Sequence, residues 1–339
     1  MRLEDFDYDL PANVIAQQPV EPRDAARLLV DQGPRTRPLH RAVRDLPHLL
    51  APGDLVVVND SRVIPARLQL QRVTGGAVEV LLLEALDEEH RSWECLIRPA
   101  RKLRRGEELA GTDGRPFLVV GARTEAGDTF VVELCAEDAM AALDSAGQVP
   151  VPPYITAPLG DPDRYQTVYA DRPGSAAAPT AGLHLTAGLL DELAAVGIRT
   201  ARVELVIGLD TFQPVTAADP GQHPIHSERY TVPAETLAAC REAQRVVAVG
   251  TTTVRALESA ATTGQASGRT RLFIHRPYDW QVVDLLLTNF HLPRTTLLMM
   301  IDAFIGARWR DLYRVALDDG YRFLSFGDAM LLRRGRSMA

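Results

Sequence analysis

The chain has few cysteines, and they are not spaced for a disulfide framework or a metal site. Its 339 residues contain only three, Cys95, Cys135 and Cys240, which are odd in number and far apart. Disulfide-stabilised domains and structural zinc sites need paired cysteines at short spacings. The eight histidines form no His-Glu-x-x-His pattern. We therefore expect three reduced thiols and no metal ion.

The sequence also lacks a long apolar run and an excess of positive charge. The longest apolar stretch near its end, residues 297–306, contains Asp302 and is too short to span a bilayer. The acidic first residues do not resemble a secretory signal, so we expect a cytoplasmic protein that does not bind membranes. The formal net charge of −7 argues against a protein that coats nucleic acid, because phosphate contacts need Lys and Arg.

Two kinds of hydrophobic pattern divide the chain. Between about residues 68 and 134, short β-rich stretches alternate with turns, which predicts a small antiparallel barrel or sandwich. Before and after this region, strand-like and helical patterns alternate, which predicts an α/β architecture. We predict an α/β domain built from residues 1–64 and 150–339, with a small antiparallel β-barrel inserted at 65–149.

Individual elements are predicted from local signals. A helix over 187–196 begins after Thr186, a good N-cap, and ends at Gly197. The stretches expected to be strands of the α/β part are 55–59, 200–207 and 246–249, and those of the inserted part are 77–83, 92–97, 117–121 and 129–134.

The segment 246–259 is the most informative in the chain. A β-branched run breaks at Gly250 into three threonines, Thr251, Thr252 and Thr253, and a helical pattern follows. This pattern predicts a strand, a tight turn and a helix whose first N–H groups the hydroxyls can cap. Such a helix start attracts carboxylates and phosphates. Alone, however, it is more typical of a βα junction that binds nothing.

Three further segments carry polar side chains in loops, where α/β proteins bind ligands. Residues 59–67 follow a buried-looking strand, 178–186 lead into a helix, and 287–296 contain an amide, an aromatic ring, an imidazole and an arginine. A lone histidine in such loops is often a hydrogen-bonded turn residue, and Phe290 is more typical of a core than of a stacking platform. Together with the threonine turn, the three segments predict one pocket.

One dense cationic run stands out in an acidic chain. It consists of Arg98, Arg101, Lys102, Arg104 and Arg105. The run is equally typical of a solvated loop and of a local RNA-binding site.

With these motifs the chain resembles the S-adenosylmethionine:tRNA ribosyltransferase-isomerase family of queuosine biosynthesis over essentially its whole length. Any one motif would be weak evidence, but seven occur in order at compatible spacing. They are residues 7–17, 58–67, 151–155, 164–170, 178–184, 250–259 and 289–293. The family's fold, an α/β domain with an inserted β-barrel, agrees with the predicted partition.

The resemblance implies a reaction in which S-adenosylmethionine donates its ribosyl group. Enzymes of the family attach this group to 7-aminomethyl-7-deazaguanine in a tRNA anticodon, rearrange it to an epoxy-cyclopentane, and release adenine and methionine. S-adenosylmethionine is then the co-substrate and no other cofactor is needed. The reaction requires a base that removes a proton beside the sulfonium and a hydrogen-bond or proton donor that assists the departure of adenine. It also requires fixed dipoles that stabilise the charges that develop. The partners expected are S-adenosylmethionine and tRNA, with the protein itself a monomer.

Site residues follow from the matched motifs. The expected proton-transfer groups are histidines that titrate near neutrality and acidic neighbours: His184, Asp210, His226, Glu228 and His291. The threonine turn, with Arg255 as ionic partner, suits the methionyl carboxylate or a tRNA phosphate. The complete set expected to bind substrate is Asn59, Asp60, Arg62, Thr180, Gly182, Thr251, Thr252, Thr253, Arg255, Asn289 and Phe290.

Two segments depart from the family pattern. At 206–212 the family usually shows His-Val-Gly-x-Gly-Thr-Phe, whereas Val206 and Asp210 stand here in place of the histidine and the second glycine. The segment 275–280 also differs from the common Tyr-Pro-Gly-Tyr-x-Phe or Trp. Two alternatives therefore remain open: a paralogue that acts on a small-molecule acceptor, and a binding protein without turnover.

Overall fold

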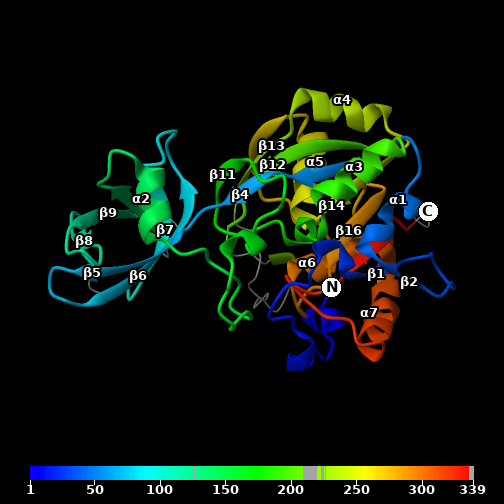
Figure 1. Cartoon of the computed structure of the whole chain (residues 1–339), viewed down its shortest axis with the longest axis horizontal. Coiled ribbons are helices and arrows are strands. Elements are labelled where there is room, and N and C mark those ends of the chain that lie inside the picture. Colours follow the sequence, from blue (N-terminus) through cyan, green and yellow to red (C-terminus); the bar gives the residue numbers. More distant parts are fainter. Residues whose placement is uncertain are drawn as a thin grey trace.

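The computed structural model describes residues 1–101, 103–124, 127, 129–208, 220–222, 225 and 227–335. It contains a closed six-stranded barrel and a nine-stranded mixed sheet, which lie side by side along the long axis of the molecule (Figure 1). This arrangement confirms the predicted fold class. The residue boundaries proposed for the two domains stay a prediction.

The large sheet has the strand order β15-β13-β12-β3-β14-β16-β17-β1-β2, and its strands come from both sides of the barrel in the sequence. Their bounds are β1 (Arg27–Val30), β2 (Leu39–Ala42), β3 (Asp54–Asn59), β12 (Arg199–Leu205), β13 (Glu228–Thr231), β14 (Arg245–Val249), β15 (Ser267–Thr270), β16 (Leu285–Asn289) and β17 (Ala329–Arg333). Strands β12, β3, β14 and β16 are parallel, so their carboxyl ends meet at one edge. Polar residues at these ends can therefore share a site.

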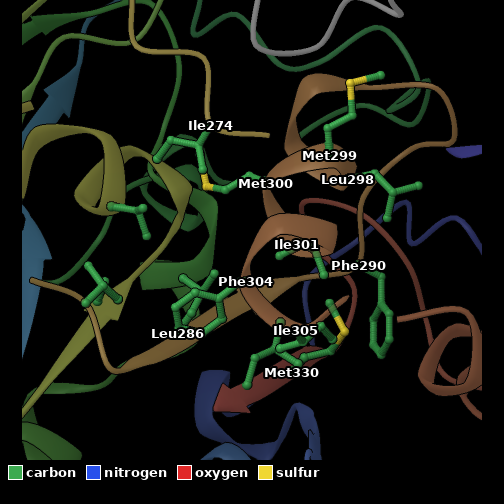
Figure 2. Close-up of a cluster of buried hydrophobic side chains, with 14 of the residues drawn as sticks. Ile274, Leu286, Phe290, Leu298, Met299, Met300, Ile301, Phe304, Ile305 and Met330 are labelled. Carbon is green, nitrogen blue, oxygen red and sulfur yellow. The ribbon is translucent and has the colours of Figure 1, made fainter. Parts of the chain in front are cut away.

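Helices cover both faces of this sheet. Successive residues of a strand point to opposite faces, so Val57 of β3 packs in the core with α5, α6 and α7 while Val56 packs with α1 and α3. Figure 2 shows the apolar residues of α6 gathered in the first of these cores. The helices of this part are α1 (Leu46–Leu49), α3 (Ala187–Ala195), α4 (Ala234–Glu242), α5 (Thr251–Thr263), α6 (Thr296–Ile305) and α7 (Trp309–Asp318).

The predicted strands and helix of the α/β part are confirmed to within two residues. Helix α3 begins where expected because the Thr186 hydroxyl accepts a hydrogen bond from the Leu189 N–H at 3.1 Å. It ends at Ala195, two residues before Gly197, whose φ of +81° reverses the chain at little steric cost.

The barrel closes in the order β10-β7-β6-β5-β8-β9 around a separate core that includes Trp93. Its strands are β5 (Arg67–Arg72), β6 (Ala77–Ala85), β7 (Ser92–Arg98), β8 (Glu108–Ala110), β9 (Pro116–Arg123) and β10 (Phe130–Leu134). Helix α2 (Ala139–Ala146) packs against it through Ala139 and Leu143. Four of these strands were predicted. Strand β8 has only three residues, too few to show the period-two pattern.

A short parallel pair lies between the two parts. Strand β4 (Ser61–Val63) leaves the large sheet after β3, and β11 (Arg172–Ser175) returns the chain beside it. Among the described residues, no helix is long and apolar enough to cross a membrane.

Candidate active site

A pocket opens where the carboxyl ends of β14 and β16 meet the start of α5. It contains about 600 Å³ of empty space, part of it open to solvent. Its described lining comes from six separate stretches of the chain: Tyr154; Ala178–Ala181; Ile207; Gly250–Thr252; Thr288–Leu292 with Thr295 and Leu297; and Leu324–Ser325. The predicted convergence of the threonine turn with the segments 178–186 and 287–296 is therefore confirmed.

The start of α5 faces this pocket without a side-chain cap. Gly250 takes a φ of +88° as the chain turns from strand to helix, which its missing Cβ permits. The prediction that the threonine hydroxyls cap the helix is wrong. Thr253 donates instead to the Val249 carbonyl at 2.7 Å, and the Thr252 hydroxyl accepts from Asn59 at 3.2 Å. The first turn of this 13-residue helix therefore has no side-chain cap, and uncapped N–H groups of this kind can bind an anion.

Asn59 is a buried cross-link and does not line the pocket. Its Nδ2 donates to the Leu205 carbonyl at 3.0 Å and to Thr252, and its Oδ1 accepts from the N–H groups of Leu205 and Ser61, both at 3.1 Å. Both donors and both acceptor positions of the amide are in use. Asn59 therefore positions Thr252 and the end of β12, and it has no free group for a substrate.

The two neighbours of Asn59 in the predicted set also lie outside the pocket lining. Asp60 is buried, and its Oδ2 lies 3.8 Å from Nε of Arg172. Burial raises the pKa of this carboxyl, and Arg172 opposes the shift. Arg62 is exposed. The segment 59–62 thus contributes to the site mainly through Asn59.

Thr180, Asn289 and His184 form a chain of hydrogen bonds at one wall of the pocket. Because the Leu324 carbonyl can only accept, the amide atom 3.2 Å from it must be Nδ2 of Asn289. The same Nδ2 lies 3.0 Å from Nε2 of His184, which therefore accepts, while Oδ1 of Asn289 accepts from the Thr180 hydroxyl at 3.1 Å. His184 is a neutral imidazole with its hydrogen on Nδ1. Thr180 lines the pocket, and its hydroxyl oxygen, having donated its hydrogen, keeps both lone pairs as acceptors.

Burial and the nearby Arg322 and Arg23 lower the pKa of His184 to about 4. Its role here is to orient Asn289.

His291 lines the pocket directly and is held in place on three sides. The backbone N–H of His291 donates to the Tyr313 hydroxyl at 3.0 Å, and its backbone carbonyl accepts from the Tyr8 hydroxyl. The ring Nε2 lies 2.9 Å from Oγ1 of Thr288. Among the described residues, Nδ1 has no hydrogen-bond partner. Burial lowers the pKa of this imidazole to about 3, so it is neutral at physiological pH.

Several predicted residues serve the scaffold instead. Phe290 is fully buried and stacks on Phe323 with ring centroids 4.6 Å apart, as its place in Figure 2 among core side chains illustrates. Arg255 and Glu228 form a buried ion pair with each other, so Arg255 is not free to bind a carboxylate in the pocket. A Cβ on Gly182 would lie 2.0 Å from the Tyr169 hydroxyl, so this position requires glycine for packing.

Tyr154 and Ser325 belong to the pocket but were not predicted as site residues. Their hydroxyl oxygens lie 2.7 Å apart, and both residues line the cavity. Tyr154 lies within the matched motif 151–155, which was the available signal. Ser325 lies in no recognised motif and reaches the pocket only through the fold.

Three predicted residues, Asp210, His226 and Lys102, lie outside the described residues. The remaining members of the cationic run, Arg98, Arg101, Arg104 and Arg105, are exposed around the connection from β7 to β8 on the barrel. None of these four arginines forms an ion pair within the described part of the chain. They lie on the barrel, away from the pocket.

The chain is similar to known proteins over nearly its whole length. A family model described as "Queuosine biosynthesis protein" matches residues 3–332. The chain belongs to this family. The matched range includes every described segment that lines the pocket.

Individual members of the family are similar over their full length. A protein named S-adenosylmethionine:tRNA ribosyltransferase-isomerase from Symbiobacterium thermophilum is 50% identical over 346 positions, covering 98% of this chain and 100% of the relative. A protein of the same name from Rubrobacter xylanophilus is 48% identical, with 99% and 98% covered. The crystal structure of S-adenosylmethionine tRNA ribosyltransferase from Thermotoga maritima has a TM-score of 0.55 at 39% identity, with 96% and 99% covered.

The buried state of His184 predicts a pH dependence of stability. Because its folded pKa of about 4 lies below the unfolded value near 6.5, the unfolded chain takes up a proton first, and stability falls as pH drops from about 6.5 to 4. Urea unfolding at pH 7 and pH 5 should show that the free energy of unfolding falls less in His184→Gln than in the unsubstituted protein. Equal decreases in both proteins would contradict a buried His184 with a lowered pKa.

Proposed function

We propose that this protein transfers and isomerises the ribosyl group of S-adenosylmethionine onto 7-aminomethyl-7-deazaguanine in a tRNA anticodon. The products are epoxyqueuosine-tRNA, adenine and methionine. The observation that carries the proposal is the convergence of four of the seven matched motifs, 151–155, 178–184, 250–259 and 289–293, on one pocket, with an uncapped helix start on one side and a neutral imidazole on another. Within the described residues, nothing in the site favours a small-molecule acceptor: Val206 is buried, and Asp210 lies outside the described residues.

The pocket has complementary places for the two ends of a sulfonium nucleoside. The first N–H groups of α5 suit the methionyl carboxylate. Apolar side chains of Ile207, Leu292 and Leu324 suit the uncharged parts of the nucleoside, and the lone pair of Thr180 suits a donor such as an amino group. We infer that S-adenosylmethionine is the co-substrate and that the reaction uses no other cofactor.

Of the histidines within the described residues, His291 is the better candidate for the base. His184 already uses Nε2 to accept from Asn289, whereas His291 keeps Nδ1 unpartnered. When Nε2–H of His291 donates to Thr288, Nδ1 carries the lone pair. It takes a proton from the methylene beside the sulfonium, the C–H bond breaks, and its electron pair stays on the carbon next to sulfur.

The low pKa of His291 is compatible with this role because the step moves a charge and creates none. Before transfer the pocket holds a sulfonium cation and a neutral imidazole; afterwards it holds a neutral ylide and an imidazolium. The burial that disfavours the imidazolium in the empty pocket also disfavours the bound sulfonium. The two desolvation penalties therefore offset each other in the bound complex.

The barrel supports the RNA side of the proposal. Arg98, Arg101, Arg104 and Arg105 are exposed and without ion-pair partners in the described part of the chain. In a protein of net charge −7, such local clusters are what a phosphate backbone can bind. We infer that the run contacts tRNA outside the modified nucleotide.

Product analysis tests the function as a whole. Mixing the protein with S-adenosylmethionine and a tRNA that carries the aminomethyl-deazaguanine should release adenine and methionine and raise the mass of the RNA. A tRNA with unmodified guanine is the matched control and should gain no mass. Adenine without RNA gain would favour a small-molecule acceptor, and no adenine at all would favour a protein that only binds.

Substitution of His291 tests the proposed base. His291→Gln should lower kcat by about 10²- to 10⁴-fold, the usual contribution of a general base, while the Kd for S-adenosylmethionine changes little. His48→Gln, an exposed histidine on α1, is the matched control and should keep the original kcat. A His291→Gln enzyme with kcat within threefold of the original would remove His291 from the chemistry.

Charge reversal on the barrel tests the RNA contact. The double substitution Arg101→Glu and Arg104→Glu should weaken tRNA binding and flatten its salt dependence, because fewer counterions are released. Arg115→Glu, at an exposed barrel arginine 3.9 Å from Asp113, serves as control and should have a smaller effect. Unchanged binding of the double variant at low salt would exclude the run from the interface.

A further inference from the structure

A second group of uncompensated arginines lies on the hairpin formed by β1 and β2. Arg35 and Arg37 are in its turn, Arg41 is in β2 and Arg44 follows the strand, and all four are exposed. We call these four residues the hairpin patch. None of them forms an ion pair within the described part of the chain. Within the described residues, their only side-chain hydrogen bond runs from Arg41 to the carbonyl of its neighbour His40.

The two carboxylates next to the patch in the sequence form no ion pair with it among the described residues. Asp31 pairs with Arg308, and Asp45 accepts from the N–H of Ala42. Some exposed arginines elsewhere have a local acidic partner, as Arg314 has Asp311. The positive charge of the hairpin patch is therefore left for a partner outside the chain.

The sheet register places part of this patch level with the pocket. Asn289 of β16 is opposite Ala329 of β17, Ala329 is opposite Leu28 of β1, and Leu28 is opposite Arg41 of β2. Three strand spacings of about 4.8 Å put the Arg41 backbone roughly 14 Å from Asn289. Strand β2 runs parallel to β16, so Arg44, which follows β2, lies toward the end of the sheet that lines the pocket. The turn with Arg35 and Arg37 lies at the opposite end of the strands.

Protection of a sheet edge does not account for all of these charges. Strand β2 is an edge strand, and a charged residue on it discourages pairing with another chain. That explanation covers Arg41. It does not cover Arg44, which follows the strand in a 3₁₀ turn (Val43–Asp45) and has no strand edge to protect.

We propose that Arg41 and Arg44 bind backbone phosphates of the RNA whose target nucleotide occupies the pocket. This inference rests on the proposed function, because it needs an RNA substrate in that pocket. The partner fits by charge, since an acidic protein can approach a polyanion only through local basic surfaces. The hairpin lies at the end of the molecule away from the barrel (Figure 1), so this contact is separate from the cationic run on β7–β8.

Paired neutralisations on the two ends of the hairpin test the proposal. Arg41→Gln with Arg44→Gln should lower the affinity for tRNA and reduce the slope of log Kd against log salt by about 1.4 to 1.8, the value for two lost phosphate contacts. Arg35→Gln with Arg37→Gln removes the same charge from the far edge and should have a clearly smaller effect. The Kd for S-adenosylmethionine and kcat at saturating tRNA should not change.

The outcomes separate this proposal from the proposed function. Equal losses in the two double variants would show a general charge effect and overturn it, as would no loss in either. Adenine release by the unsubstituted protein on modified tRNA tests the function independently. Normal release together with unchanged binding by Arg41→Gln/Arg44→Gln would leave the enzyme intact and remove the hairpin patch from the interface.

Discussion

The pocket depends on one buried amide that joins three elements of the sheet edge. Asn59 ends β3, holds the end of β12 through both backbone groups of Leu205, and donates to Thr252 in the first turn of α5. A buried polar group that loses its hydrogen-bond partner destabilises the fold, because no water replaces the partner. The four hydrogen bonds of Asn59 therefore depend on one another. The orientation of the α5 N-terminus, where we propose that the methionyl carboxylate binds, follows from this amide.

At the opposite wall of the pocket, a second amide, that of Asn289, is also oriented by its hydrogen-bond partners. Leu324 offers only a carbonyl, which fixes the orientation of the Asn289 amide and through it the neutral state of His184 and the hydroxyl direction of Thr180. One histidine is thereby used for positioning. The other, His291, is held by Tyr8, Tyr313 and Thr288 but keeps one nitrogen open to the cavity. Two similar side chains thus acquire different chemical roles from their neighbours.

The surface charge of this protein depends on which arginines have a carboxylate partner as well as on its net charge. About half of the described arginines lie within 4.0 Å of a carboxylate, as Arg245 does with Asp54 and Arg276 with Asp302. The exposed arginines on the β7–β8 connection and on the β1–β2 hairpin form two groups without such a partner among the described residues. A protein of net charge −7 can present positive potential to RNA only where such local compensation is missing.

The sequence alone determined the α/β architecture, the inserted barrel, the start of α3 and the convergence of the threonine turn with two of the three predicted loop segments, because periodicity, caps and glycine turns are local signals. It did not determine what each polar residue contacts. Asn59, Arg255 and Gly182 read as ligands in the sequence, yet the fold uses them for a cross-link, an ion pair and a close approach. Ser325 and Arg41 carried no local signal at all. Their positions arise from strand register and burial, which depend on residues hundreds of positions apart and exist only in the folded chain.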